Sequence, residues 1–222
     1  MKKLLSHPAD LREHFFDGMT VMIGGFMATG APEYLITQLI ESQVKELTLI
    51  STDTGSPGKG ASRLIATGQV KQLIASHIGT NPQTGEQMNQ GHLKVELVPQ
   101  GTLAERIRSA GAGLGGVLTP TGIGTQVATG KPIVEVNGKP YLLETPLHAD
   151  LALIRGSKVD QRGNVFYAKT TQNFNPLMAT AAKKVIVEAA QMVATGDIAP
   201  EAVHTPSIYV DYICEEALCQ MH

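Results

Sequence analysis

The sequence is poor in cysteine and has no long apolar run. Only two of its 222 residues are cysteines, Cys214 and Cys219, which excludes a disulfide framework. No stretch reaches the about 7–15 apolar residues of a signal peptide or the roughly 20 residues of a membrane span. We therefore expect a cytoplasmic protein in a reducing compartment, with no membrane partner.

An excess of charge of either sign is also missing. Lysine and arginine number 18 against 20 aspartates and glutamates, which gives a net charge of −2 with neutral histidines. A chain this close to neutrality has no global field that would attract nucleic acid. The seven histidines form neither an HExxH motif nor a cysteine–histidine spacing, so no metal site is expected.

Apolar residues and glycine are what the sequence does have. Hydrophobic residues make up 42% of the chain, enough for a packed core. The length is about what one large α/β domain needs, so we expect a single domain over residues 1–222. The 23 glycines are about 10% of the chain, against a usual share of about 7%, and they lie in clusters.

Short apolar runs alternate with amphipathic stretches. Segments 31–44 and 102–110 have helical periodicity, and the second begins with a capping-box spacing of Thr102 and Glu105, with Arg106 and Arg108 facing outward. The alternation predicts an α/β fold, with an open, mostly parallel sheet and helices on both of its faces. The predicted strands are Thr20–Ile23, 47–51, 73–76, 95–98, 151–154 and 185–187.

Two regions depart from this alternation. Residues 131–145 hold two β-prone runs around Asn137-Gly138, a type I′ hairpin signal, which predicts a small antiparallel layer. Near the C-terminus, a predicted helix carries Cys214 and Cys219 in a structural role.

The most informative motif is DGMTVMIGGFMATGAP, residues 17–32. A strand ends at Ile23, a glycine-rich turn follows, and Pro32 lies where a helix would begin. Gly25 and Gly30 have P-loop spacing, but the lysine and hydroxyl residue that should follow are absent, which argues against a Walker-type ATPase. The turn and the helix N-terminus suit an anionic or carbonyl-rich ligand, and a tight turn without a ligand is the alternative.

A second glycine cluster, GAGLGG at residues 111–116, matches the GxGxxG pattern in residue type and spacing but not in its predicted structural context. A helix precedes it and Pro120 follows, whereas a dinucleotide-binding turn leaves a strand and opens a helix. We expect a loop that is mobile or lies against a ligand.

Polar side chains follow several predicted strands. Gln100 precedes the helix at 102–110, and its amide is either an oxyanion donor or an ordinary polar loop group. His77 is either an acid, base or ligand, or a hydrogen-bonded scaffold residue. Asp53 and Glu188 can reach a cleft, with caps and salt bridges as their simpler roles.

Residues 17–32 resemble the α-subunit signature of the family I coenzyme A transferases, the family that includes the 3-oxoacid CoA-transferases. That signature is an acidic residue and glycine, an apolar strand, then Gly-Gly-Phe, three residues, glycine, one residue and proline. The resemblance continues through ASHIGTNPQTG, VPQGTLAERIRSAGAGLGGVLTPTGIGT, ADLALIRGSKVDQRGNV and NFNP, and so covers about residues 10–206.

The resemblance implies one half of a short-chain acyl-CoA:carboxylate CoA-transferase that works by ping-pong through a glutamyl-CoA thioester. In the family the nucleophilic glutamate lies in a Ser-Glu-Asn-Gly motif of the β half, and none of the 13 glutamates here has that context. A separate β subunit in an α2β2 assembly is therefore implied. Acyl-CoA, short-chain carboxylic acids and CoA are implied as substrates, with no tightly bound cofactor.

Site residues follow from the same resemblance. Gln100, in VPQGT, matches the family's oxyanion-hole glutamine, and the loops at 111–116 and 119–122 are implied to face the partner. His77 and Asn81 match the pattern without a known chemical role. The loop implied to bind CoA consists of Gly24, Gly25, Phe26, Met27, Ala28, Thr29 and Gly30.

Two other functions stay open at this point. Related α/β scaffolds bind small molecules as regulatory domains without catalysis, and others are sugar-phosphate isomerases that carry their own acid and base. A partner chain with the Ser-Glu-Asn-Gly motif would favour the transferase over both.

Overall fold

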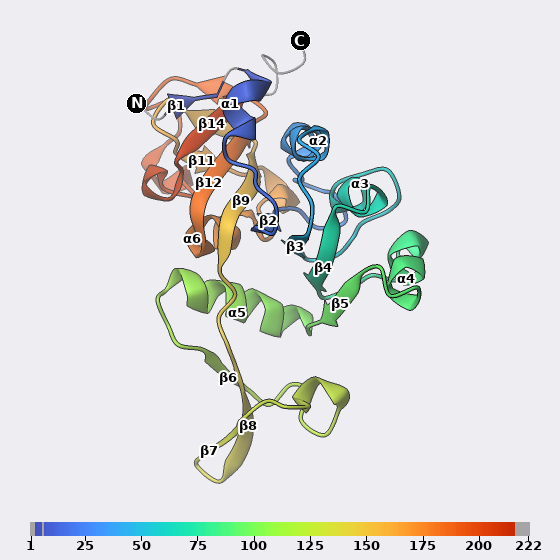
Figure 1. Cartoon of the computed structure of the whole chain (residues 1–222). Coiled ribbons are helices and arrows are strands. Elements are labelled where there is room, and N and C mark those ends of the chain that lie inside the picture. The colour runs from blue at the N-terminus through green and yellow to red at the C-terminus, as the bar shows by residue number, and fades with distance from the viewer. Residues whose placement is uncertain (1–2, 6, 216–222) are drawn as a thin grey trace.

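An eight-stranded sheet forms the centre of the computed structural model, which describes residues 3–5 and 7–215 (Figure 1). Every pairing within this sheet is parallel. All six predicted strands are present, which confirms the mostly parallel α/β fold. Across the sheet the strands are β1 (Lys3–Leu4), β14 (Tyr212–Glu215), β12 (Ala182–Ala189), β9 (Ala149–Gly156), β2 (Thr20–Ile23), β3 (Leu47–Ile50), β4 (Val70–Ala75) and β5 (Lys94–Leu97).

Helices cover both faces of this sheet because its strands bury apolar side chains on both sides. In β9, Leu151 and Leu153 face one hydrophobic cluster and Ala152 and Ile154 face the other. Helices α1 (Pro8–Arg12), α2 (Glu33–Glu41) and α3 (Ala61–Ala66) complete the first cluster, with α4 (Pro82–Asn89) beside α3. Helices α5 (Gln100–Gly111) and α6 (Asn175–Ala181) complete the second cluster.

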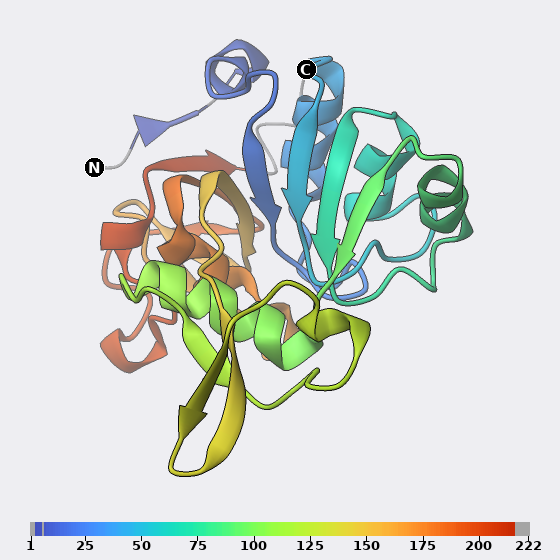
Figure 2. The same cartoon turned by 60° about the horizontal axis from the view of Figure 1, so that its bottom comes forward.

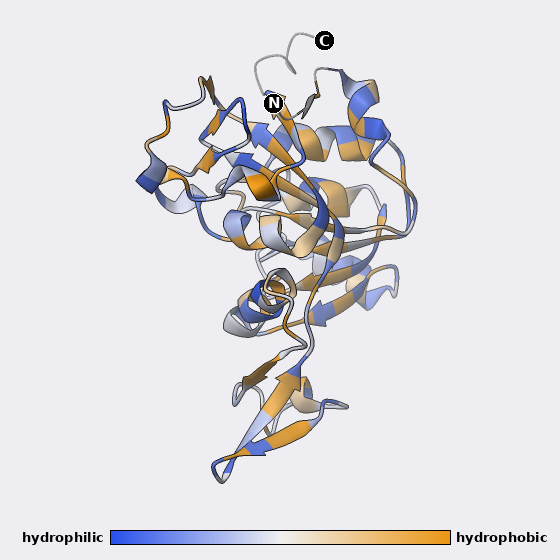
Figure 3. Cartoon of the chain, turned by 90° about the vertical axis from the view of Figure 1, so that its left-hand side faces the viewer, coloured by the Kyte–Doolittle hydropathy of each residue, from blue (hydrophilic) through white to orange (hydrophobic). Residues whose placement is uncertain are grey.

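The predicted antiparallel layer is present and larger than expected. Strands β7 (Ile133–Val136) and β8 (Lys139–Glu144) form the hairpin, and Asn137 and Gly138 both have the positive φ of a type I′ turn, +52° and +72°. Strand β6 (Val117–Thr119) adds a third strand on β8. Figures 1 and 2 show this sheet projecting beyond α5, and Figure 3 shows apolar residues along its strands.

The remaining elements were not predicted from the sequence. Cys214 is a buried residue of strand β14, so the helix predicted around it is wrong. Cys219 lies outside the described residues. A second small sheet shares the hydrophobic cluster of α5 and α6 through Val159 and Val165. The sheet comprises β10 (Lys158–Asp160), β11 (Val165–Phe166) and β13 (Met192–Val193), and short 3-10 helices are at Gln126–Ala128, Lys169–Thr171, Pro200–Ala202 and Ser207–Tyr209.

The start of α5 differs from the expected capping box. The helix begins at Gln100, so Thr102 lies inside its first turn, and the Thr102 hydroxyl is buried without a hydrogen-bond partner in the described structure. Glu105 pairs with Arg108 instead of reaching back to the helix start. Arg106 is 7% exposed, not outward, because its Nη1 donates to Glu96 (2.7 Å).

The chain reverses its direction of travel across the sheet between β2 and β9. Strands β3, β4 and β5 follow β2 on one side, whereas β9, β12 and β14 extend on the other. Open α/β sheets bind ligands at such a switch point, outside the carboxyl ends of the strands. Among the described residues, no helix is long and apolar enough to cross a membrane, and no group of three acidic, histidine or cysteine side chains could hold a metal.

Candidate active site

Polar groups at the carboxyl ends of four neighbouring strands form one hydrogen-bonded row. The Thr52 hydroxyl, after β3, lies 2.8 Å from the Gly25 carbonyl oxygen, after β2. The Ser76 N–H, after β4, donates to the Thr52 carbonyl (2.9 Å). The Ser76 hydroxyl contacts Oε1 of Gln100, the first residue of α5. The row therefore connects the glycine loop with Gln100, two regions that the sequence predicted separately.

Contact with Ser76 decides which end of the Gln100 amide is occupied. The Ser76 hydroxyl lies between Gln100 Oε1 and the Thr52 carbonyl, which is 2.6 Å away. The hydroxyl carries one proton and has both oxygens within reach, so the Thr52 carbonyl and Gln100 Oε1 share it as acceptors. Nε2 then remains as the donor of this exposed side chain. The arrangement suits donation to a ligand at the sheet edge.

The glycine loop, residues 24–30, contains two non-glycine residues in left-handed conformations. Met27 has a φ of +49° and Ala28 a φ of +67°, a conformation that costs free energy and persists only where neighbours enforce it. Asp53, which is 6% exposed, holds the loop because its Oδ2 accepts the Met27 N–H (3.0 Å) and its Oδ1 accepts the Gly55 N–H (2.7 Å). Among the described contacts, Asp53 therefore neither caps a helix nor pairs with a cation, the two simpler roles considered for it, but holds the loop through backbone N–H groups.

Two asparagines from the NFNP segment hold the same loop from the other side. Asn173 Nδ2 donates to the Thr29 carbonyl (2.9 Å), and Asn175 Nδ2 donates to the Gly30 carbonyl (3.1 Å). A Cβ at Gly24 would lie 1.9 Å from Asn175 Oδ1, so only glycine fits there beside the buried amide. Two motifs far apart in the sequence thus interlock.

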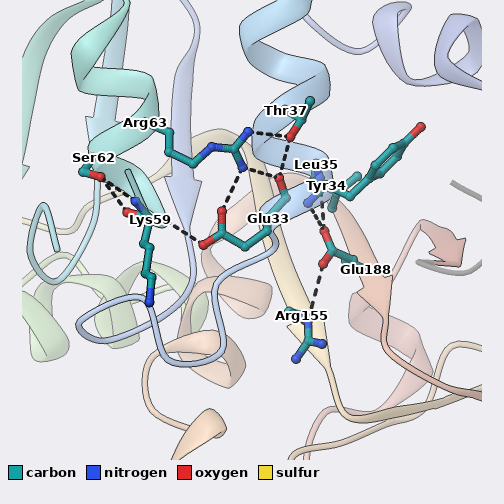
Figure 4. Close-up of polar contacts among 10 residues, drawn as sticks. Glu33, Tyr34, Leu35, Thr37, Lys59, Ser62, Arg63, Arg155 and Glu188 are labelled. Carbon is teal, nitrogen blue, oxygen red and sulfur yellow. Dashed lines mark hydrogen bonds and ion pairs between the residues drawn. The ribbon is translucent and has the colours of Figure 1, made fainter. Parts of the chain in front are cut away.

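The N-terminus of α2, which follows the loop, is already occupied by a carboxylate of the chain (Figure 4). Oε2 of the buried Glu188 accepts the N–H groups of Tyr34 (3.0 Å) and Leu35 (3.1 Å), and its Oε1 lies 3.4 Å from Arg155 Nε. The Glu33 N–H is also used, by the Ala31 carbonyl. The expectation that this helix N-terminus is open to an anionic ligand is therefore wrong, and the cap and salt-bridge roles considered for Glu188 are confirmed.

A second carboxylate at the same helix end joins α2 to α3 (Figure 4). Glu33 Oε1 accepts the Gly60 N–H (2.7 Å), and its Oε2 accepts from Arg63 Nη1 (2.8 Å). Arg63 Nη2 also donates to the Thr37 hydroxyl (2.7 Å). These bonds fix the 56–60 turn, whose Gly60 lies against Ala28 of the loop.

Space beneath the loop is too small for a substrate. The cavity that the loop lines has a volume of about 10 Å³, which is about the room that one water molecule needs. Any larger ligand therefore has to lie over the loop. The lining residues are Ile23, Gly24, Gly25, Ala28, Ala31, Ser51, Thr52, Asp53, Gly55 and Ala61.

The other residues singled out from the sequence lie around this edge without joining the row. The second glycine cluster ends α5 and leads into β6, and Gly111 packs so closely on α6 that a Cβ would lie 2.0 Å from Thr180 Oγ1. His77 is exposed, and only its backbone bridges to Asp53. Asn81 precedes α4 with its side-chain amide buried and unpartnered in the described structure.

Comparison with known proteins identifies the family of this chain. The model of the coenzyme A transferase family matches residues 6–216. The chain belongs to the coenzyme A transferase family. The match spans the loop, the hydrogen-bonded row and both asparagines, so the motifs of the expected resemblance all lie within it.

Two bacterial relatives cover nearly all of this CoA transferase chain. The acetoacetyl-CoA:acetate/butyrate CoA transferase alpha subunit of Clostridium acetobutylicum is 54% identical over 207 residues, 93% of this chain and 95% of the relative. The alpha subunit of the acetate CoA-transferase of Escherichia coli K12 is 51% identical over 213 residues, 96% and 97% of the two chains.

Solved structures agree on the fold of the CoA transferase chain. The acyl-CoA transferase of E. coli O157:H7, solved as a thioester complex with CoA, superposes with a TM-score of 0.83 at 22% identity. The alignment covers 97% of this chain and 47% of that enzyme, so the chain spans about half of it.

Proposed function

We propose that this chain is the α subunit of a heteromeric CoA-transferase that exchanges CoA between short-chain carboxylic acids. The observation that carries the proposal is the row that joins the glycine loop to the Gln100 amide at the switch point, in a chain of the CoA transferase family. Both bacterial relatives are named as alpha subunits, which supports a second subunit for this chain as well.

The proposed reaction places its nucleophile on the β subunit. A glutamate carboxylate attacks the thioester carbonyl carbon, the C–S bond breaks, and CoA leaves as a thiolate from an acyl-glutamyl anhydride. The thiolate attacks the glutamyl carbonyl, which releases the first acid as its carboxylate and forms a glutamyl-CoA thioester. The second acid takes over the CoA by the reverse steps.

Gln100 has the role of oxyanion donor in this proposal. Attack on the thioester puts negative charge on the carbonyl oxygen, and a donor that is already oriented stabilises that charge without rearrangement. Nε2 of Gln100 meets this requirement because Ser76 occupies the oxygen end of the amide. Loop residues Gly24–Gly30 would hold the CoA thioester beside it, with CoA bound as a substrate.

The acids are short. The two relatives are named for acetate, acetoacetate and butyrate, and one or two methylenes change binding by only about 1–3 kcal/mol. We therefore assign the class, short-chain acyl-CoA and carboxylates, and expect an α2β2 complex in a cytoplasmic setting.

Reconstitution with a β subunit tests this function. The chain is purified alone and together with a β subunit that carries a Ser-Glu-Asn-Gly motif, and transfer from acetoacetyl-CoA to acetate is measured by the loss of acetoacetyl-CoA and the formation of acetyl-CoA. We expect co-purification of the two chains and activity only in the complex. Transfer by the chain alone, or an inactive complex, would contradict the proposal.

A further inference from the structure

The antiparallel sheet that projects beyond α5 has two outer strands, and each is unpaired on one side. The order of the strands is β6-β8-β7, so β6 and β7 pair only with β8. Among the described contacts, no backbone group of Val117, Leu118 or Thr119 bonds outside that pairing. Alternate residues of an outer strand direct their N–H and C=O groups away from the neighbouring strand, so at least one of these three residues presents both groups outward. Such an edge is a template for one more strand.

A groove lies beside β6 and distinguishes it from the other outer strand. The groove has a volume of about 510 Å³ and runs between α5 and β6. Its walls include Gly101 and Thr102 of the helix and Leu118 and Thr119 of the strand, and none of the described residues that line it belongs to β8 or β7. The groove is therefore on the unpaired side of β6, where an added strand would lie.

The volume of this groove exceeds what a short acid fills. A short-chain acid has about four to seven non-hydrogen atoms, and at roughly the 30 Å³ that one water molecule takes in the liquid it occupies less than half of the groove. The acid that exchanges CoA therefore does not account for this space. A segment of polypeptide has the necessary size.

The charges along the groove do not suit the nucleotide of CoA either. Its charged wall residues are Glu105 and Arg108, and Nε of Arg108 donates to the Glu105 carboxylate (2.8 Å). Because these two charges cancel, the groove offers no excess of positive charge to a group with several phosphates. The remaining wall is apolar or carries hydroxyl groups, which suits an uncharged occupant.

A buried hydroxyl in the wall also lacks a partner. Thr102 is 4% exposed, and its hydroxyl makes no hydrogen bond in the described part of the chain. An unpaired buried hydroxyl costs free energy, which a donor or acceptor on an incoming segment would recover. This is the second observation, independent of the open strand edge, that points to an occupant of the groove.

We propose that an extended, uncharged segment of the β subunit lies in this groove and adds to β6 as a fourth strand of the projecting sheet. The groove begins at Gly101, the residue after Gln100, so the subunit that brings the nucleophile to Gln100 is the one that reaches the groove. Leu118, which is 43% exposed in the chain alone, is covered by the added strand. This inference rests on the proposed function, which places the nucleophile on a second subunit.

Hydrogen exchange measures the added strand directly. Exchange of the amides in a peptide that spans β6 is followed by mass spectrometry, in the chain alone and in its complex with the β subunit. The complex should slow this exchange about 10-fold or more, because the outward N–H groups become hydrogen-bonded. A peptide that spans β7, at the opposite edge of the same sheet, is the internal control and should exchange at the same rate in both samples.

A charge placed in the groove tests the same contact through association. Leu118→Asp puts a carboxylate where the segment has to pack, and it should raise the dissociation constant of the two subunits at least about 30-fold, as at an interface hot spot. Ile133→Asp adds the same charge on β7, at a side chain that is 61% exposed, and should leave the dissociation constant unchanged. A thermal melt of each variant chain alone shows whether it is folded.

The outcomes separate this inference from the function on which it rests. Unchanged exchange of β6 in a complex that transfers CoA, or equal losses of association in Leu118→Asp and Ile133→Asp, would overturn the inference and leave the transferase intact. Protection of β6 that grows with the concentration of the chain alone would assign the edge to a second copy and would overturn it as well. A Leu118→Asp complex that assembles normally but has a raised KM for acetoacetyl-CoA would do the same, because the groove would then hold substrate. A wild-type chain that forms no complex with the β subunit would overturn the proposed function and, with it, the inference.

Discussion

The two halves of the large sheet differ in the role of the residues at the carboxyl ends of their strands. Strands β2 to β5 end in the polar groups that face the open edge, of which Gln100 is the exposed last member. On the other half, β9 and β12 end in Arg155 and Glu188, which turn inward and hold the first turn of α2. The β2–β5 half presents Gln100 at the open edge, whereas the β9–β12 half, together with Asp53 after β3, fixes the backbone around it. Substitutions of the presented and of the supporting residues should therefore separate activity from stability.

The largest effect on activity is expected at Gln100, which follows β5 in the first half of the sheet. Gln100→Ala should lower kcat of the reconstituted complex about 10²–10³-fold, because the oxyanion loses its donor, while the thermal unfolding of the chain stays unchanged. Steady-state kinetics and a thermal melt measure the two quantities. Gln83→Ala, which removes another exposed glutamine from the first turn of a helix, is the control and should change neither. An unchanged kcat in Gln100→Ala would remove this residue from the site.

Gly24 lies where the two halves of the sheet meet, and its substitution should lower both the activity of the complex and the stability of the chain. Gly24→Ala forces a Cβ into the buried Asn175 amide and should destabilise the chain by about 3 kcal/mol, with loss of activity. Gly115→Ala is the matched control in the second glycine cluster, where a Cβ meets nothing within 4 Å, and denaturant unfolding should not detect it. Adding Asn175→Ala to Gly24→Ala should cost less than the sum of the single changes. Strictly additive changes in the free energy of unfolding would contradict the close contact between Gly24 and Asn175.

Substitutions of Ser76, which follows β4, test whether its hydroxyl orients the amide of Gln100. Ser76→Ala removes the hydroxyl that holds Oε1, so kcat should fall about 10-fold with little change in KM. Ser76→Thr retains the hydroxyl and should keep most of the activity. Equal losses in the two variants would mean that packing, and not the hydrogen bond, explains the effect.

The smallest effect concerns an ion pair at the opposite end of the strands, where β2 and β9 meet. A hydrogen bond from Lys183, together with the N–H of Thr20, holds the pKa of Asp150 below its ordinary value of 3.8. A carboxylate whose pKa is lower in the folded state stabilises the fold above its unfolded pKa, and this contribution is lost as the pH falls. Asp150→Asn should therefore destabilise the chain by about 0.5–1 kcal/mol at pH 7. Urea unfolding should show the difference shrinking below pH 4, and a constant difference down to pH 2 would contradict the assignment.

Local patterns were enough to predict the parallel sheet and the type I′ hairpin, because alternation of apolar runs and the Asn137-Gly138 turn act within a few residues. The same reasoning failed where a distant partner intervenes. Thr102 looked like a helix cap, but Pro99 and Gln100 start the helix earlier. Arg106 looked exposed on helical periodicity, but Glu96 and the Thr145 carbonyl draw it inward.

Residues that support the candidate site were the hardest to predict. Asn173 bonds to a carbonyl 144 residues away, and Glu188 caps a helix 154 residues away. Neither pairing has a sequence signature, and the resemblance to CoA transferases identified the segments without their contacts. A sequence pattern can mark such a residue, but the residue's partner depends on how the strands are ordered.

The sequence by itself determined six strands of the main sheet, the β7–β8 hairpin, the helices α2 and α5, the glycine loop after β2, the position of Gln100 after β5, and the family. Only the tertiary structure decided that Gly25, Thr52, Ser76 and Gln100 form one row, and that Glu188 closes the helix N-terminus to a ligand. The physical reason is the range of the forces. Backbone preference and apolar periodicity act over a few residues, whereas buried polar groups take their partners from whichever strand ends the sheet topology brings together.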